Sequence, residues 1–163
     1  MQDLNELQKQ LLEDFEYKDG EIFWKKRGPG RVLGKKVGVA NKRNYIIMYY
    51  RFKHTYVHRA IFLMHHGCLP KYIDHIDGNP LNNKIENLRE ATVAQNRANS
   101  KTPSTSKTGI KGVCWLKKEQ RYFAYCMVNG KQHDLGTHKN IEDAATKVKE
   151  FREKHLGEFA RHQ

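Results

Sequence analysis

The sequence is 163 residues long and 38% hydrophobic, which suffices for one modest core or two small ones and excludes a large multidomain enzyme. Its 30 Lys and Arg residues against 18 Asp and Glu residues give a net charge of +12, which favours a partner that carries many phosphates. No apolar run approaches the roughly 20 residues that span a bilayer, and the first residues lack the apolar core of a signal peptide, so we expect a soluble intracellular protein without membrane association.

The first part of the chain predicts a helix, a small antiparallel meander and a second helix. Apolar residues recur at helical spacing over residues 3–15 and end at Phe15, which indicates an amphipathic helix. Residues 20–57 contain short alternating runs separated by Gly-, Asn- and Lys-rich turns, a pattern typical of a meander. Residues 58–67 return to helical character and end at Gly67, which suits the left-handed conformation that follows many helices.

The central segment predicts two strands and a helix. Residues 72–75 form a short strand that ends in Asp74-His75, residues 76–83 form a long polar turn, and residues 84–89 form a second strand. Thr92 to Gln95 is a capping box that opens the helix containing Asn96. In this arrangement, the end of the first strand and the first turns of the helix can converge on one point.

Asp74, His75 and Asn96 are the residue types that phosphodiester hydrolysis needs. An imidazole with a pKa near neutrality can activate a water molecule. Carboxylate and amide oxygens can hold Mg²⁺ while leaving coordination positions for phosphate and water. If the strand is regular, adjacent Asp74 and His75 point to opposite sides, one toward a cation and one toward the attacking water.

This segment resembles the HNH endonucleases over about residues 56–100, in particular the phage and intron-type members that carry DHIDGN, NNxxENLR and QN at this spacing. The resemblance implies that His75 is the general base and that Asp74 and Asn96 bind Mg²⁺ or Mn²⁺. It also implies that Asn87 orients the long loop by hydrogen bonding and so supports catalysis. Because the third letter of the motif is Asn96 rather than His, a zinc-type histidine ligand set is disfavoured.

Other polar residues around this motif are interpreted structurally. Asx residues are common in turns for backbone reasons, so four of them are expected to be turn formers: Asp77, Asn79, Asn82 and Asn83. Three histidines on the preceding helix are expected to pack or face solvent, and none is assigned to the site: His58, His65 and His66.

Beyond Asn99 the composition changes. Residues 100–109 have no apolar side chain and are rich in Ser, Thr and Lys, which indicates a flexible basic linker and a domain boundary. Three strand-like runs follow within residues 110–137, and the second and third are joined by Asn129-Gly130, a strong hairpin signal. A helix then begins after Asn140 and covers one face of the sheet.

This last region resembles the ethylene-response-factor type of DNA-binding domain of plants. The matching landmarks are Lys111-Gly112-Val113, Tyr122-x-Ala124, Asn129-Gly130-Lys131, Leu135-Gly136-Thr137 and Glu142-Asp143-Ala144-Ala145. The resemblance implies that the sheet lies in the major groove of DNA with the helix behind it. Plant members carry Arg at several strand positions that are different here, so their sequence preference does not transfer: Cys114, Leu116, Met127 and Gln132.

The charge distribution agrees with this division. Residues 1–66 and residues 100–163 each carry a net +6, whereas residues 67–99 are neutral, so two basic flanks enclose a neutral centre. Within the last region the excess lies on residues 100–140. The predicted DNA contacts are Arg97, Lys101, Lys107, Lys111, Lys117, Lys118, Arg121, Tyr125 and Lys131.

These observations predict an α+β protein with an HNH nuclease domain over residues 1–99, whose ββα-metal core spans residues 72–99. A linker over residues 100–109 and a DNA-binding domain over residues 110–163 complete it. The leading function is a homing-type endonuclease that nicks double-stranded DNA as a monomer and that, by resemblance, is phage-encoded and acts in the cytoplasm of a bacterial host. The alternatives are a non-catalytic DNA-binding regulator that retains a nuclease fold and, less favoured, an RNA-binding protein.

Overall fold

The computed structural model describes residues 3–102 and 105–161, which form two compact units, Met1–Glu90 and Ala91–Gln163. Helices and small antiparallel sheets occur in both, so the predicted α+β class is confirmed. No helix in this described part is long and apolar enough to cross a membrane. The predicted boundary after Asn99 differs from the observed division after Glu90.

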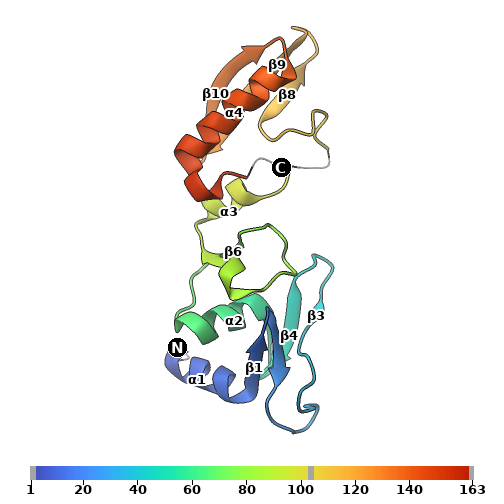
Figure 1. Ribbon diagram of the computed structural model, residues 1–163, viewed down its shortest axis with the longest axis vertical. Coiled ribbons are helices and arrows are strands. Elements are labelled where there is room, and N and C mark those ends of the chain that lie inside the picture. The colour runs from blue at the N-terminus through green and yellow to red at the C-terminus, as the bar shows by residue number, and fades with distance from the viewer. Residues whose placement is uncertain (1–2, 103–104, 162–163) are drawn as a thin grey trace. The chain divides into compact units, whose positions relative to one another are not determined.

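The first unit contains the predicted helices and meander (Figure 1). In chain order its elements are α1 (Leu4–Asp14), β1 (Phe15–Lys18), β2 (Glu21–Trp24), β3 (Val39–Ala40), β4 (Ile46–Tyr50), β5 (Lys53–Tyr56), α2 (Val57–His66), β6 (Ile73–His75), the 3₁₀ helix η1 (Ile85–Asn87) and β7 (Leu88–Glu90).

The first helix begins where the sequence predicts but ends earlier. Asp3 caps α1, because its side chain accepts a hydrogen bond from the Asn5 amide at 3.0 Å. Phe15, predicted as the last apolar position of the helix, is the first residue of β1 and pairs with Trp24. The Asp19-Gly20 turn, with φ angles of 49° and 86°, closes this hairpin and draws Phe15 out of the helix.

The core of the first unit lies between α1, α2 and the inner faces of the hairpins. Phe15, Ile22 and Ile61 are fully buried, and the Phe15 ring lies 4.5 Å from the Trp24 ring, centroid to centroid. The end of α2 is as predicted: Gly67 adopts φ 67° and its amide donates to the Leu63 carbonyl at 3.0 Å. This core fixes α2 beneath the segment that carries Asp74 and His75.

The β6–β7 hairpin is shorter than the sequence predicts. Asp74 pairs with Arg89 and His75 pairs with Leu88. The predicted second strand over residues 84–89 is a 3₁₀ turn over Ile85–Asn87 followed by the short strand β7. The Tyr17 hydroxyl accepts a hydrogen bond from the Ile85 amide at 3.0 Å, so this turn is anchored to β1 rather than paired in a sheet.

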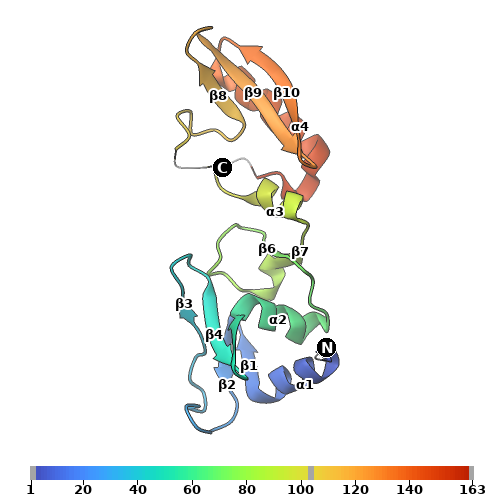
Figure 2. The ribbon, with the colours of Figure 1, turned by 180° about the vertical axis from the view of Figure 1, so that it is seen from behind.

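The second unit contains a sheet with one helix on it. Its elements are α3 (Val93–Asn99), β8 (Val113–Leu116), β9 (Arg121–Val128), β10 (Lys131–His138), α4 (Ile141–Leu156) and the 3₁₀ helix η2 (Gly157–Phe159). The strand order is β10-β9-β8, and α4 lies across one face of this sheet in both views (Figures 1 and 2). Asn129 and Gly130, with φ angles of 49° and 80°, form the predicted hairpin turn.

Helix α3 packs within the second unit, which explains the observed boundary. Ala91, Ala98 and Phe159 form a small buried cluster with Leu156 against it. The Arg152 guanidinium on α4 also donates from Nη2 to the Ala98 carbonyl at 2.8 Å. The apolar and polar contacts of α3 therefore join it to α4. These contacts could not be predicted from the sequence, because the two helices are far apart along the chain.

Candidate active site

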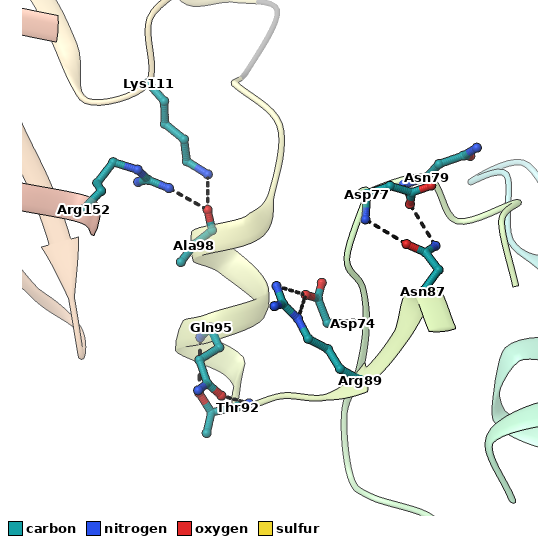
Figure 3. Close-up of polar contacts among 10 residues, drawn as sticks. All are labelled: Asp74, Asp77, Asn79, Asn87, Arg89, Thr92, Gln95, Ala98, Lys111 and Arg152. Atoms are coloured by element: carbon teal, nitrogen blue, oxygen red, sulfur yellow. Dashed lines mark hydrogen bonds and ion pairs between the residues drawn. The ribbon is translucent and has the colours of Figure 1, made fainter. Parts of the chain in front are cut away.

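Asn87 ties together the loop between β6 and β7. Its Oδ1 accepts from the Asp77 amide at 3.0 Å, and its Nδ2 donates to Asp77 Oδ1 at 3.0 Å (Figure 3). The same Nδ2 also donates to the Asn82 carbonyl at 2.7 Å. Burial alone would raise the pKa of Asp77, but hydrogen bonds from the Asn79 amide and from Asn82 and Asn87 hold that pKa below its ordinary value. These contacts agree with the loop-orienting role expected of Asn87.

The same loop brings Asn83 against His75. Asn83 is 2% exposed, and its Oδ1 lies 2.9 Å from His75 Nε2. An amide oxygen only accepts hydrogen bonds, so His75 is the donor in this contact and Nε2 carries a proton. Asn83, expected to be a turn former, is thus a buried partner of the predicted general base.

Aromatic rings surround the other sides of His75. The His58 ring lies 5.1 Å from the His75 ring, centroid to centroid, at an interplanar angle of 72°, and the Tyr45 ring lies 6.0 Å away. His58 also contacts Tyr45 and Tyr56, at 5.7 and 5.4 Å. The predicted packing role of His58 therefore places it directly beside the site.

His58 is an uncharged neighbour of His75. It is 7% exposed, and its Nδ1 makes no hydrogen bond to any described residue. Burial, followed by electrostatic interactions with His75 and Arg59, lowers the pKa of His58 to about 3. At neutral pH the His58 imidazole is neutral, so it contributes shape to the site without adding charge.

Asp74 is held by an arginine from the opposite strand. Asp74 is 4% exposed, and Arg89 approaches its Oδ2 with Nε and Nη2, each at 3.0 Å (Figure 3). Asp74 and His75 are consecutive on β6, so their side chains leave opposite faces of the strand, as predicted. Sequence reasoning missed Arg89, although a cation directly opposite a buried carboxylate is the pairing that such burial requires.

Asn96 lies on α3 in the second unit. The predicted capping box is present: the Gln95 amide donates to Thr92 Oγ1 at 3.2 Å, and the Thr92 amide donates to Gln95 Oε1 at 2.7 Å (Figure 3). The convergence of Asn96 and Asp74 on one point stays a prediction, because Asp74 belongs to the first unit and Asn96 to the second.

Lys111 closes the other end of α3. Its Nζ donates to the carbonyls of Arg97 at 3.3 Å and Ala98 at 2.8 Å, and also to that of Ser100 (Figure 3). Burial, then repulsion from Arg152 and Arg161, lowers the pKa of Lys111 to about 8. This helix-end contact differs from the predicted DNA contact, because the ammonium group already donates hydrogen bonds to three carbonyls.

The other predicted DNA contacts fall into two groups within the second unit. Arg97, Lys101, Lys107 and Tyr125 line one groove of about 930 Å³ between α3, the segment after it and the sheet. The remaining residues lie on the turns or strands of the sheet, outside this groove: Lys117, Lys118, Arg121 and Lys131. Their contacts with DNA stay a prediction.

The donor chemistry of the site fits a magnesium-type cation. The described residues contain no group of three or more His, Cys, Asp and Glu side chains that could hold a metal ion. Carboxylate and amide oxygens, such as those of Asp74 and Asn96, are nevertheless donors that Mg²⁺ uses together with water and phosphate. Asp74 is buried and hydrogen-bonded by Arg89, as carboxylate ligands commonly are.

Comparison with known proteins identifies the class. Residues 55–98 match the HNH endonuclease family. Protein 3.8 of Escherichia phage T7 is 40% identical over 106 residues, which are 64% of this chain and 87% of that protein. Uncharacterized HNH endonuclease L560 of Acanthamoeba polyphaga mimivirus is 38% identical over 107 residues, which are 64% of this chain and 54% of that protein. No solved structure matches.

An α+β fold with a histidine and an aspartate side by side on a short hairpin, within the matched segment, is that of a DNA endonuclease. The chain belongs to the HNH endonuclease family.

Proposed function

We propose that this endonuclease hydrolyses one phosphodiester bond of double-stranded DNA with His75 as general base, in a ββα-metal site completed by Asp74 and Asn96. The observation that carries the proposal is the hydrogen bond between His75 Nε2 and the buried Asn83 Oδ1 at 2.9 Å. Because Nε2 donates in this contact, Nδ1 is the ring nitrogen that would take up the proton when His75 acts as a base.

The proton and bond changes then follow. A water oxygen attacks the scissile phosphorus, its proton passes to His75 Nδ1, and the bond from phosphorus to the 3′ oxygen breaks in line with the attack. Asn83 holds the ring while it gains charge, and neutral His58 limits how the ring can tilt. Asn87 keeps the intervening loop closed around these groups.

Asp74 and Asn96 would hold Mg²⁺ or Mn²⁺. When bound, such an ion supplies positive charge that stabilises the phosphorane and the departing oxygen. Arg89 holds the Asp74 carboxylate in place for that role.

The second unit is proposed to bind DNA and select the site, as in a homing-type enzyme. Residues 100–140 hold 8 Lys and Arg residues and 2 acidic residues, a balance suited to a phosphate backbone. One hydrolytic centre per chain would nick one strand per binding event. A regulator without catalysis would have no need to bury His75 with a dedicated partner, which argues against the non-catalytic alternative.

Cleavage of supercoiled plasmid DNA tests the proposal. We expect the purified protein to produce open circles before linear DNA in the presence of Mg²⁺ or Mn²⁺, and EDTA to stop the reaction. His75→Ala should abolish cutting while DNA affinity is retained, and His66→Ala, an exposed histidine on the same helix as His58, should cut normally. Cutting by His75→Ala at the wild-type rate would overturn the assignment of the base.

A further inference from the structure

The sheet β3-β4-β5 of the first unit has one covered face and one open face. On β4, Met48 and Tyr50 point into the core and are about 5% exposed or less, whereas Tyr49 between them is 61% exposed. Cross-strand partners share a face of a sheet, so the register assigns five residues to the open side. We call this the aromatic face: Val39, Ile47, Tyr49, His54 and Tyr56.

The aromatic face is continuous with the active site. Tyr49 contacts His54 at 5.2 Å between ring centroids, and Tyr56 contacts His58, which lies against His75. Tyr45 links Tyr56 to the site a second time, at 5.6 Å. A set of ring contacts therefore leads from Tyr56, at the edge of the aromatic face, to the predicted general base.

The segment that forms this face carries charge of one sign. Residues 22–73 contain 12 Lys and Arg residues and neither Asp nor Glu. Lys42 and Arg43 lie in the turn before β4, and Arg51 and Lys53 lie at the turn after it, all of them exposed. Apolar and aromatic groups between cations, without carboxylates, complement a polyanion with ring-shaped groups rather than another protein surface.

The turn at the end of β4 adds a second observation. Tyr50 pairs with Lys53, so Arg51 and Phe52 form a two-residue turn, with φ angles of 48° and 65°. Such turns favour Asn-Gly because side chains strain this backbone conformation. Phe52 is 91% exposed, so packing of its own side chain within the unit does not compensate the strain. A large apolar side chain held out in this way indicates contact with a partner.

We propose that the aromatic face and the Arg51-Phe52 turn bind the duplex DNA that flanks the scissile phosphate. Tyr49 and Tyr56 pack on sugars and base edges, Phe52 enters a groove, and the neighbouring cations bind phosphates. The inference rests on the proposed nuclease function, because it places the substrate of His75 on this surface. It assigns substrate positioning to a surface of the first unit.

The test measures binding in a His75→Ala background, in the full chain, with a short fluorescent duplex DNA at several salt concentrations. We expect Tyr49→Thr and Phe52→Gly each to weaken binding about tenfold without changing the salt dependence, because neither residue is charged. Lys53→Gln should instead reduce the slope of that dependence by about one. Leu12→Gln, an exposed apolar position on α1, should bind like the parent.

Two further readouts separate this inference from a loss of folding and from failure of the nuclease proposal. Phe52→Gly should raise the melting temperature, since glycine relieves the turn, while affinity falls. In the active chain, the same substitutions should raise KM and leave kcat unchanged. Unchanged affinity of both variants would overturn the inference, as would an equal loss of affinity in Leu12→Gln. If the wild-type protein does not cut DNA but the two variants still bind it more weakly, only the proposed catalysis is overturned.

Discussion

The two units bury polar side chains for different purposes. In the first unit, His58 and Asn83 place uncharged side chains against the His75 imidazole, which is proposed to act as a base. In the second unit, Lys111 and Arg152 direct their charges at the carbonyls that end α3. A base must keep a lone pair, whereas a helix end needs donors, so the two groups of polar side chains serve opposite requirements.

The residues of the motif are also divided between the two units. The hairpin with Asp74 and His75 belongs to the first unit, and the helix with Asn96 belongs to the second. A defect in either unit should therefore affect cutting through a different residue. Variants of the two buried groups can test this division separately.

The largest effect is expected for the stability of the first unit in acid. The folded pKa of His58 is about 3, below its ordinary value of 6.5, so the unfolded chain takes up a proton that the folded chain does not accept. Stability is lost as pH falls from 6.5 toward 3, by up to roughly 5 kcal/mol at the limit. His58→Phe keeps a ring but cannot titrate, so its unfolding free energy should fall less between neutral and acidic pH.

Denaturant unfolding at each pH measures this difference. His66→Phe, at an exposed position of α2, is the matched control and should follow the parent. If His58→Phe loses as much stability in acid as the parent does, His58 is not held neutral by burial.

A smaller effect is expected for the partner of the base. Asn83→Ala removes the acceptor of His75 Nε2, so the ring is free to adopt the other tautomer or to turn. We expect kcat to fall about 100-fold with DNA affinity unchanged. Single-turnover cleavage measures the change, and Asn79→Ala, an exposed asparagine of the same loop, is the control. A wild-type rate in Asn83→Ala would show that another contact orients the imidazole.

Local signals predicted much of the fold. Gly67 ends a helix, Asn129-Gly130 forms a hairpin turn, and Thr92 with Gln95 caps α3, because each depends on neighbouring backbone. Phe15 shows where such signals compete: helical spacing included it in the helix, but the following Asp19-Gly20 turn and its pairing with Trp24 place it in a strand.

The partners of the site residues were hidden by distance along the chain or by competing explanations. Asn83 looks like any turn asparagine, and only closure of the loop by Asn87 brings it to His75. His58 occupies a helical position that packing alone explains, and its contact with His75 spans two elements. Asp74, His75 and Asn87 could be proposed from sequence because their spacing forms a motif, whereas buried contacts need the assembled core.

The smallest effect concerns Lys111, where sequence and structure suggest different roles. Lys111→Met keeps the apolar stem but removes the donor to the carbonyls of Arg97, Ala98 and Ser100, so we expect the unfolding free energy to fall by about 1–2 kcal/mol. If Lys111 serves the helix end, the salt dependence of DNA binding should stay unchanged, while exposed Lys117→Gln reduces its slope by about one.

Denaturant unfolding and salt-dependent binding of these two variants decide between the roles. A reduced salt slope in Lys111→Met with unaltered stability would restore the DNA contact predicted from sequence. Loss of stability with an unaltered slope would mean that a lysine counted among the basic residues of the second unit acts on its own chain. The DNA-binding surface would then consist of the remaining exposed cations, and the Lys111 charge would stabilise α3 without contacting DNA.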